Sequence, residues 1–274
     1  MIKLLIPVLL ISCSIEALAF EKYAYAPIRQ FDFGYGVQKG NLNDHLNKIG
    51  YKKIKVIYHD QFLDKNNQPD PQKIKRIAEA AKTDMTPVSF DYEKGNPNNP
   101  KSMIEPAKKT LMLYKQYGGK APVGLYALFP RNTHGGERMT ERRKAQYREN
   151  NKEYAELVKY VDFISPSLYN YDLRDFNNWK KSVDFSLEEA RKYSQGKPII
   201  PYITASYYLP KSNDGKVKTI QLTESEMKQR LDYLRSKKVD GVIFWESAVT
   251  FNEKGERPTF RIKSGWGKAL IDFK

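Results

Sequence analysis

Short apolar runs alternate along the chain with longer segments in which apolar residues recur every three or four positions. The short runs are rich in Val, Ile, Phe and Tyr, which is typical of buried β-strands. This pattern predicts seven strands, because seven such runs are separated by polar or helix-like segments. The predicted strands are residues 28–34, 53–58, 86–93, 123–129, 161–169, 198–207 and 241–245.

The segments between these runs have the spacing of amphipathic helices, with apolar residues gathered on one face. Thr223 followed by Glu226 forms a capping box, in which each side chain can bond an otherwise unpaired N–H of the first turn. A helix is therefore expected to begin at this pair. The predicted helices are residues 72–82, 140–160, 178–193 and 223–237.

Strands that alternate with helices imply parallel strands joined by helical crossovers. Seven such units without a second zone of composition predict an α/β fold, a TIM-like (β/α) barrel of seven or eight parallel strands. A doubly wound open sheet is the alternative, but the glycine-rich phosphate fingerprints of many such folds are missing. Residues 20–274 are thus expected to form a single (β/α)-barrel domain, with loops at 95–100 and 131–136 after two of its strands.

The first residues have the pattern of an export signal. Lys3 provides a basic start, residues 4–12 are an apolar run too short to span a bilayer, and Ala17-Leu18-Ala19 is a small-x-small cleavage site. Residues 1–19 are therefore expected to be a signal peptide that is removed, which leaves a protein of the bacterial periplasm or a secreted one. A buried N-terminal helix is the alternative.

The only cysteine lies inside this leader. Residues 10–13 (LISC) also resemble a bacterial lipobox, so a lipoprotein with a lipid anchor on Cys13 is the alternative to cleavage after Ala19. Cleavage after Ala19 leaves a chain without cysteine. That excludes a disulfide framework, a thiolate nucleophile and a cysteine-based zinc site in the mature protein.

The formal net charge is +15, and it stays +15 without residues 1–19 because these hold one base and one acid, Lys3 and Glu16. A basic exported protein is expected to meet acidic polymers or membrane surfaces. Export disfavours nucleic acid as a partner, and no transmembrane segment is expected. A solvated lysine-rich surface without any partner is the alternative reading of the charge.

A pair of acids ends the predicted third strand. Strand side chains alternate, so Asp91 and Glu93 share one face while Tyr92 points the other way. At the C-terminal end of a barrel strand that face opens on the usual active-site mouth. Two acids so close raise one pKa, and a glycosidase acid needs a proton held near neutrality. The pair is a candidate catalytic site, with a solvated turn or a salt bridge to lysine as the alternative.

Aromatic and polar residues stand at the ends of other predicted strands. Sugar rings stack on aromatic faces, and phenol groups bond their hydroxyls and amides. A ring of such residues around a carboxylate pair would form the floor of a sugar site, although some of the 19 tyrosines must belong to the core or the surface. These candidates are Tyr126, Ser167, Tyr169, Tyr171, Tyr202, Tyr207 and Trp245.

Metal and serine-hydrolase chemistry find little support. His45, His59 and His134 are the only histidines, and none has a partner at a metal-ligand spacing. His59 follows the second predicted strand and could line the pocket, although a surface or structural role is favoured. No Gly-x-Ser-x-Gly elbow is present. No metal and no cofactor are expected.

Five segments resemble, in order and in spacing, strands of the hyaluronidases, a family of glycoside hydrolases. The first resembles the family's Asp-Trp-Glu strand, and the others resemble the strands that follow it in the barrel. The five segments are residues 90–93 (FDYE), 124–130 (GLYALFP), 166–169 (PSLY), 198–202 (PIIPY) and 240–245 (DGVIFW).

The resemblance implies a retaining mechanism in which the N-acetyl oxygen of the substrate attacks the sugar carbon and gives an oxazoline. Glu93 would be the general acid and then the base, and Asp91 would hold the acetamido N–H. Tyr169 would bond the acetamido group, Trp245 would pack against it, and Tyr126 would line the same subsite.

The chain also departs from the family. The arginine that follows the acid in the family is absent, and Asn96 stands near its place as a candidate substrate-binding residue. The disulfides of the animal enzymes are missing. Chitinase-like barrels also end an acidic strand in Glu, but this chain lacks their longer run of aspartates.

Three functions follow from these observations. The first is a retaining endo-glycosidase that hydrolyses a β-linked N-acetylhexosamine polysaccharide, and a hyaluronan- or chondroitin-like polyanion would suit the charge. The second is a glycosidase that acts on peptidoglycan or a chitin-like glycan. The third is a non-catalytic, basic glycan-binding protein on the same barrel, because barrels host many activities.

Overall fold

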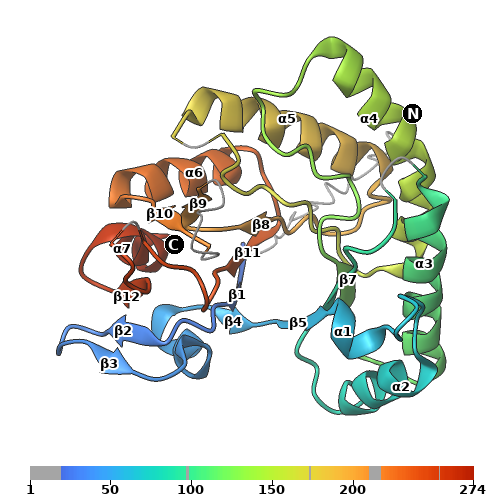
Figure 1. Ribbon diagram of the computed structural model, residues 1–274, viewed down its shortest axis with the longest axis horizontal. Helices are drawn as coiled ribbons and strands as arrows, with labels where there is room; N and C mark the ends of the chain where they lie inside the picture. The colour runs from blue at the N-terminus through green and yellow to red at the C-terminus, as the bar shows by residue number, and fades with distance from the viewer. Residues whose placement is uncertain (1–19, 97–98, 173, 210–216, 253) are drawn as a thin grey trace, which may run out of the picture.

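The structure is a computed structural model, and it places the chain in one α/β arrangement (Figure 1). The expected signal peptide, its cleavage site and Cys13 lie outside the residues that the structure describes. The described residues are 20–96, 99–172, 174–209, 217–252 and 254–274.

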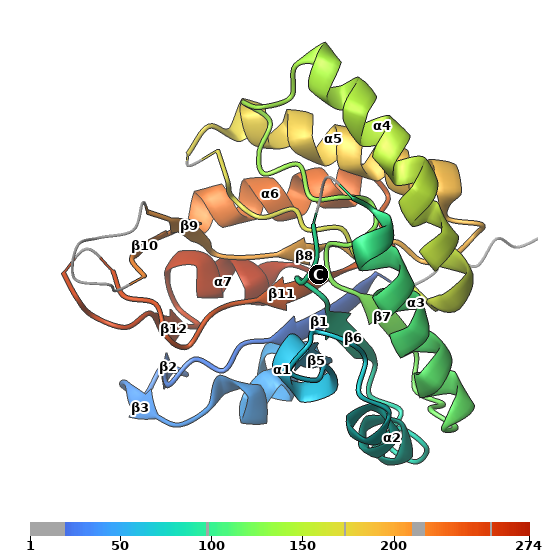
Figure 2. The ribbon, with the colours of Figure 1, turned by 45° about the vertical axis from the view of Figure 1, so that its right-hand side comes forward.

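A ring of parallel segments forms the centre of the fold, as in a TIM-like barrel. Regular pairing gives two parallel sheets, one in the order β4-β1-β11-β8 and the other in the order β5-β6-β7. Figures 1 and 2 show these strands in the middle of the molecule with helices outside them. The strands are β1 (Glu21–Tyr25), β4 (Lys52–Lys53), β5 (Lys55–Tyr58), β6 (Val88–Asp91), β7 (Val123–Leu125), β8 (Tyr202–Ile203) and β11 (Gly241–Trp245).

Two irregular connections join these sheets. On one side β4 and β5 are separated only by Ile54, whose N–H donates to the carbonyl of Ala24 in β1. On the other side residues 161–169 pair with β7 and β8 through isolated bridges rather than a ladder, at Tyr126–Ser165 and Ser167–Tyr202 among others. Seven parallel segments therefore follow one another around the ring, and the predicted strand at 161–169 takes part without regular pairing.

The register brings the C-terminal ends of neighbouring strands together. Tyr25 of β1 lies opposite Trp245 of β11, and Tyr58 of β5 lies opposite Asp91 of β6. In a parallel barrel these ends form the mouth that carries active sites. The fold thus assembles aromatic residues and an acid from distant parts of the sequence on one rim.

Alternate residues of the strands fill the inside of the ring, as expected from the period of two in a strand. The interior cluster is apolar and aromatic, and Gly124 leaves room in it, because a Cβ there would lie 2.4 Å from the ring of Phe163. The buried members of this cluster are Ile54, Val56, Phe163, Tyr169, Ile200, Tyr202 and Ile243.

Helices cover the outside of the ring and form the larger core between themselves and the strands. Three of these helices were expected nearly as they stand, at α2, α5 and α6, and the predicted helix at 140–160 divides into α4 and a 3₁₀ turn. The helices are α1 (His59–Phe62), α2 (Pro71–Ala80), α3 (Lys101–Gln116), α4 (Glu141–Tyr154), α5 (Phe176–Tyr193), α6 (Glu224–Ser236) and α7 (Gly265–Asp272), with 3₁₀ helices η1 (Leu42–Ile49) and η2 (Ala155–Tyr160).

Side-chain caps set where these helices begin. Asp70 accepts hydrogen bonds from the backbone N–H groups of Gln72 and Lys73 at the start of α2. At α6 the predicted capping box is confirmed, because Thr223 and Glu226 bond each other's backbone N–H. Such caps satisfy N–H groups that have no partner within the helix.

Two small sheets lie outside the ring, and one corrects a prediction. Residues 28–34 were expected to be the first barrel strand, but the strand there, β2 (Gln30–Asp32), pairs with β12 (Thr259–Arg261) and β3 (Gln38–Lys39) at one side of the molecule. The barrel strand is β1 instead. The other small sheet pairs β9 (Ser206–Tyr208) with β10 (Thr219–Gln221) antiparallel.

Candidate active site

A pocket of about 320 Å³ opens at the C-terminal ends of the ring strands. Most of its lining residues belong to the ring strands or directly follow them. Seven of the eleven are tyrosine or tryptophan, and two are acids. The lining residues are Val56, Tyr58, His59, Asp91, Glu93, Tyr126, Tyr169, Tyr171, Tyr202, Tyr208 and Trp245.

The two candidate acids line this pocket together. Asp91 is the last residue of β6 and is 8% exposed, whereas Glu93 lies two residues further on and is exposed. Tyr92 between them turns to the opposite side, where its ring packs 6.2 Å from that of Phe62. The alternation of strand side chains therefore places one acid deep in the pocket and the other nearer its opening.

The buried acid holds a proton at neutral pH. Burial, and after it the nearby negative charge of Glu93, raises the pKa of Asp91 to about 8. Its Oδ1 atom is buried without a hydrogen-bond partner among the described residues. An unpartnered buried carboxyl oxygen is uncommon in folded proteins, and it leaves Asp91 free to bond a group that enters the pocket.

The aromatic floor is built by rings in mutual contact. The ring of Trp245 stacks on Tyr169, with centroids 5.7 Å apart and planes 24° apart, and its Nε1 donates to the hydroxyl of Tyr58 at 3.1 Å. Tyr126 packs against Tyr169 and Tyr202 with centroids 5.8 and 4.9 Å away. These contacts hold the rings in place for stacking on a flat ligand.

Ser167 acts behind this floor. It is 3% exposed, and its hydroxyl lies 3.4 Å from the hydroxyls of both Tyr126 and Tyr171. Tyr171 also accepts a hydrogen bond of 2.6 Å from Nδ2 of Asn132. Ser167 is thus outside the set of residues that line the pocket, and it fixes two tyrosines that do line it.

Two candidate residues lie elsewhere. Tyr207 is completely buried in the outer core, where its hydroxyl accepts from Arg230, because alternation in β9 turns Tyr208 rather than Tyr207 toward the pocket. Asn96 lies in an exposed loop before α3, and its backbone bonds Ser102. Neither Tyr207 nor Asn96 is among the residues that line the pocket.

Besides the apolar Val56, three lining residues were not among the candidates that the sequence suggested for substrate contact. His59 begins α1 and lines the pocket, which was one of the two positions considered for it. Tyr58 precedes it at the end of β5, and Tyr208 ends β9 at 36% exposure. The signal for Tyr58 and His59 was their place at the end of a predicted strand, whereas no local pattern distinguishes Tyr207 from Tyr208.

A second buried carboxyl lies directly behind the floor. Glu246 follows Trp245 and is fully buried, and burial raises its pKa. It accepts four hydrogen bonds of 2.9 to 3.2 Å, so both of its oxygens are partnered. The donors are the hydroxyls of Thr204 and Ser206 and the backbone N–H groups of Ala205 and Ser247.

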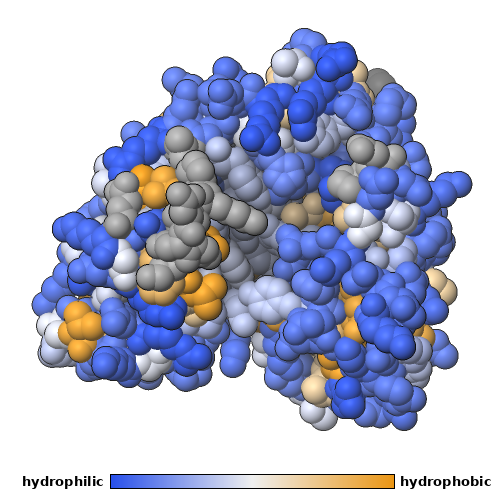
Figure 3. All heavy atoms as spheres, viewed as in Figure 1, coloured by the Kyte–Doolittle hydropathy of each residue, from blue (hydrophilic) through white to orange (hydrophobic). Residues whose placement is uncertain are grey.

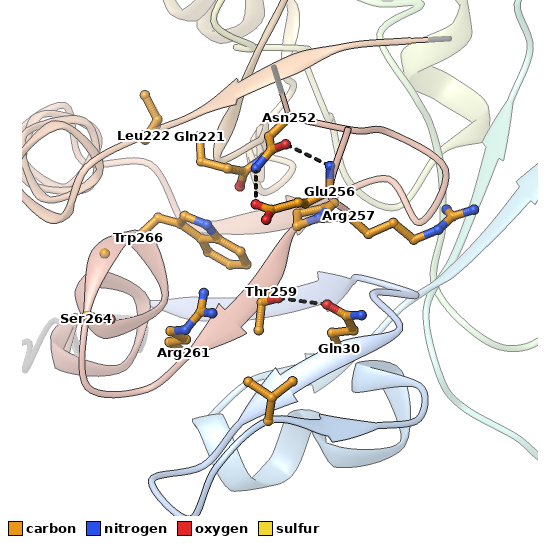
Figure 4. Close-up of a pocket in the computed structure, with 13 residues that line it drawn as sticks. Gln30, Gln221, Leu222, Asn252, Glu256, Arg257, Thr259, Arg261, Ser264 and Trp266 are labelled. Carbon is orange, nitrogen blue, oxygen red and sulfur yellow. Dashed lines mark hydrogen bonds between the residues drawn. The ribbon is translucent and has the colours of Figure 1, made fainter. Parts of the chain in front are cut away.

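A larger pocket of about 660 Å³ lies beside the small β12-β2-β3 sheet (Figure 4). Glu256 is the only acid among its described lining residues, and both its side chain and its backbone N–H bond Asn252. Gln30 and Thr259 also bond each other across the sheet. Without a second acid this pocket lacks the pair that acid–base cleavage of a glycosidic bond requires.

The surface around these cavities is strongly polar. Figure 3 shows a mainly hydrophilic face that is hollowed near its centre. Within the described part of the chain, no group of three or more His, Cys, Asp or Glu side chains could hold a metal ion. The same residues contain no helix that is long and apolar enough to span a bilayer.

No protein-family model matches the chain, and no curated protein matches it significantly in sequence. Solved structures do match. Bee venom hyaluronidase aligns over 84% of this chain and 91% of its own, with a TM-score of 0.55 at 16% identity. The same enzyme in complex with a hyaluronic acid tetramer aligns with a TM-score of 0.53 at 15% identity over the same shares of both chains.

The spore cortex-lytic enzyme SleL of Bacillus cereus aligns over 91% of this chain and 65% of its own, with a TM-score of 0.48 at 11% identity. The likeness to bee venom hyaluronidase establishes that the chain has the fold of that barrel. It does not establish the reaction, because one fold carries many activities.

Proposed function

We propose that the protein is a retaining endo-glycosidase that cleaves a β-linked N-acetylhexosamine polysaccharide at the pocket of Asp91 and Glu93. The observation that carries the proposal is the pairing of a buried, protonated Asp91 with an exposed Glu93 over an aromatic floor. Paired carboxyl groups beside stacked rings are the equipment for acid–base cleavage of a sugar linkage.

In the proposed reaction the pair supplies one proton. Glu93 protonates the leaving glycosidic oxygen while the N-acetyl oxygen of the substrate attacks the sugar carbon. The bond to the leaving sugar breaks and an oxazoline ring forms with inversion. Water then attacks the sugar carbon while Glu93 takes its proton, so that the carbon–oxygen bond of the oxazoline breaks, the acid is restored and the configuration is retained overall.

Asp91 controls where that proton resides. In the free protein it rests on Asp91, because burial disfavours the ionised carboxyl. A bound sugar would exclude water from Glu93 and place its acetamido N–H against the open Oδ1 of Asp91. In the proposed reaction Asp91 passes its proton to Glu93 when the sugar binds, and the charge left on Asp91 stabilises the cationic oxazoline.

The substrate is proposed to be acidic. The net charge of +15 would draw a polyanion such as hyaluronan or a chondroitin-like chain toward the pocket. Tyr169 and Trp245 would hold the acetamido group, since Tyr169 is 8% exposed and stacks on the indole. Peptidoglycan and chitin-like polymers contain the same N-acetyl group and are the alternative substrates.

The replacement Glu93→Gln tests this function. Gln keeps the shape of Glu but cannot deliver or recover a proton, so hydrolysis of hyaluronan should fall by about 10³- to 10⁴-fold. Binding of hyaluronan oligosaccharides and the unfolding midpoint should stay near the wild-type values. Reducing-end release and calorimetry measure these quantities.

Glu105→Gln is the matched control, because Glu105 is an exposed acid on α3 and does not line the pocket. It should leave the rate unchanged. Hyaluronan stripped of its N-acetyl groups should resist the wild-type protein, because it lacks the nucleophile. Near-full turnover by Glu93→Gln would refute the assignment. The wild type should also be tested on chondroitin, peptidoglycan and chitin. If it binds these polymers or hyaluronan but cleaves none of them, a non-catalytic binding protein is favoured.

A further inference from the structure

A further cavity, of about 280 Å³, lies next to the aromatic pocket and is lined by cationic and amide side chains. It is called the second cavity below, and the aromatic pocket is the first. Its residues come from the loop after β7 and from α4, whose start is capped by Thr140. No acid is among the described residues that line it. The lining residues are Arg131, Asn132, His134, Arg143, Gln146, Tyr147 and Asn150.

This cavity shares a wall with the proposed catalytic pocket. Tyr171 lines the catalytic pocket, and its hydroxyl accepts a 2.6 Å hydrogen bond from Asn132, which lines the second cavity. The ring of His134 also packs against Tyr171 with centroids 5.3 Å apart. A chain of sugars that fills the first pocket would therefore meet the second at a neighbouring ring.

The arginines of the second cavity are held by aromatic rings rather than by acids. Arg131 lies over the ring of Tyr154 at 5.2 Å, and Arg143 lies over Tyr147 at 5.9 Å. Over the described residues neither arginine forms an ion pair. Stacking fixes the planar guanidinium and leaves its N–H donors available to a carboxylate.

The field in this cavity is positive. Desolvation, followed by the charges of Arg131, Arg138 and Arg143, lowers the pKa of His134. The nearest acids of α4 do not cancel this field, because Glu141 and Glu149 pair with lysines of the same helix. Asp172 is buried and accepts hydrogen bonds from the backbone N–H groups of Gly136 and Glu137.

We propose that Arg131 and Arg143 form a subsite that binds the carboxylate of an acidic sugar next to the N-acetylhexosamine in the catalytic pocket. The proposal rests on the proposed glycosidase function and adds the residues that would recognise the acidic sugar of its substrate. Guanidinium groups bind carboxylates through paired N–H donors, and the neighbouring Asn132 and Gln146 can bond sugar hydroxyls. The subsite would favour acidic chains over neutral polymers of N-acetylhexosamine.

Two natural sugars would bring a carboxylate to this place. A hexuronic acid carries it on the ring, as in hyaluronan and chondroitin, and muramic acid carries it on a lactyl ether, as in peptidoglycan. Rates on hyaluronan and on peptidoglycan strands freed of peptides separate these sources. Carboxyl-reduced hyaluronan keeps the linkages and acetamido groups of hyaluronan but lacks its charge, so it isolates the contribution of the carboxylate.

The test compares two adjacent arginines of α4. Arg143 lines the cavity and Arg142 does not, so Arg143→Gln and Arg142→Gln remove the same charge at nearly the same place. Arg143→Gln should raise the KM of the better acidic polymer about 3- to 10-fold with kcat unchanged, the effect of one charge-assisted hydrogen bond at a partly exposed site. Arg131→Gln should act in the same direction.

Three outcomes decide the proposal. Arg142→Gln should change KM less than about twofold, and an equal effect of both variants would mean that only net charge matters. On carboxyl-reduced hyaluronan, Arg143→Gln and Arg142→Gln should have the KM of the wild type. A KM raised there by Arg143→Gln alone would refute carboxylate binding. A KM unchanged by Arg143→Gln and Arg131→Gln on every acidic polymer would also overturn it.

Failure of the glycosidase function can be told apart from failure of the subsite. If the wild type cleaves no polymer, calorimetric binding of hyaluronan and of its carboxyl-reduced form replaces the kinetic readout. Binding that depends on the carboxylate and weakens in Arg143→Gln would support the subsite while the reaction is refuted. Cleavage at the same rate with and without the carboxylate would support the glycosidase function and refute the subsite.

Discussion

Two buried carboxyl groups at the mouth of the barrel differ in one respect, the number of partners that the protein gives them. Asp91 ends β6 and Glu246 follows β11, and burial raises the pKa of both. Glu246 accepts four hydrogen bonds from its surroundings. Asp91 has a buried oxygen with no described partner and faces a cavity.

The difference separates a structural acid from a candidate catalytic one. Glu246 ties the end of β11 to residues 204–206, which lead into β9 and so carry Tyr208 to the pocket. A fully bonded network rigidifies what it joins. Asp91 pays a desolvation cost without such compensation, and uncompensated burial of this kind is characteristic of sites that bind a ligand.

Among the variants that test this comparison, Asp91→Asn should change activity most. Asn keeps the shape but cannot carry charge, so kcat should fall about 10²- to 10³-fold, as when one preorganised electrostatic group is removed. The proton with a pKa of about 8 is lost with Asp91, so the basic limb of kcat/KM should move toward acid pH. An unchanged pH profile, measured from pH 4 to 9, would contradict the proposed proton sharing.

The same variant also makes a prediction for stability. The folded state of the wild type keeps the Asp91 proton up to a pKa of about 8, while the unfolded state loses it near the ordinary value of 3.8. The folded state thus binds more protons between these values, and the unfolding free energy should fall as pH rises through that window. Asp91→Asn should remove this part of the pH dependence, which is on the order of a few kcal/mol. Urea unfolding of the wild type and the variant at pH 5 and at pH 9 measures it.

A smaller effect is expected from Glu246→Gln. Gln can accept with one oxygen only, and its NH₂ group would face donors, so at least one buried N–H or O–H loses its partner. The unfolding free energy should fall by about 1–3 kcal/mol, measured by urea denaturation. The exposed Glu153→Gln is the control and should change it by less than about 0.5 kcal/mol. A stability equal to wild type would remove the structural role assigned to Glu246.

The sequence predicted which acids meet at the mouth better than the identity of its strands. The alternation of Asp91, Tyr92 and Glu93 is local, so a period of two was sufficient to place both acids on one face. The choice of the first barrel strand was wrong because β1 (EKYAY) and residues 28–34 (IRQFDFG) are both short segments that mix apolar with polar residues. Only pairing with β11, more than 200 residues away, decides between them.

Two other features depend on tertiary contacts that no local pattern contains. Helix α3 was not predicted, since a loop rich in Asn and Pro precedes it and Pro106 lies inside it. Tyr207 and Tyr208 differ only in the face of β9 that they occupy. That face is set by pairing with β10 and by the bond from Arg230 to the Tyr207 hydroxyl.

The smallest effect is expected from Tyr169→Phe, which extends the comparison to a neutral group. Among the described residues no hydrogen bond reaches the Tyr169 hydroxyl, while the ring stacks on Trp245 and packs at a tilt against Tyr126. The change therefore removes no internal bond and keeps the stacking, so the unfolding free energy should move by less than about 0.5 kcal/mol.

Activity should respond differently, because the free hydroxyl of Tyr169 is proposed to bond the acetamido group. Loss of one neutral hydrogen bond should lower kcat/KM on hyaluronan about 3- to 10-fold. Tyr35→Phe is the control, since Tyr35 is 91% exposed and outside the pocket. A loss of stability in Tyr169→Phe without a loss of rate would mean that its hydroxyl has a structural partner. In that case Tyr169 would have a structural role like that of Glu246. Asp91 would then be the one member of this comparison with a polar atom left to bond the substrate.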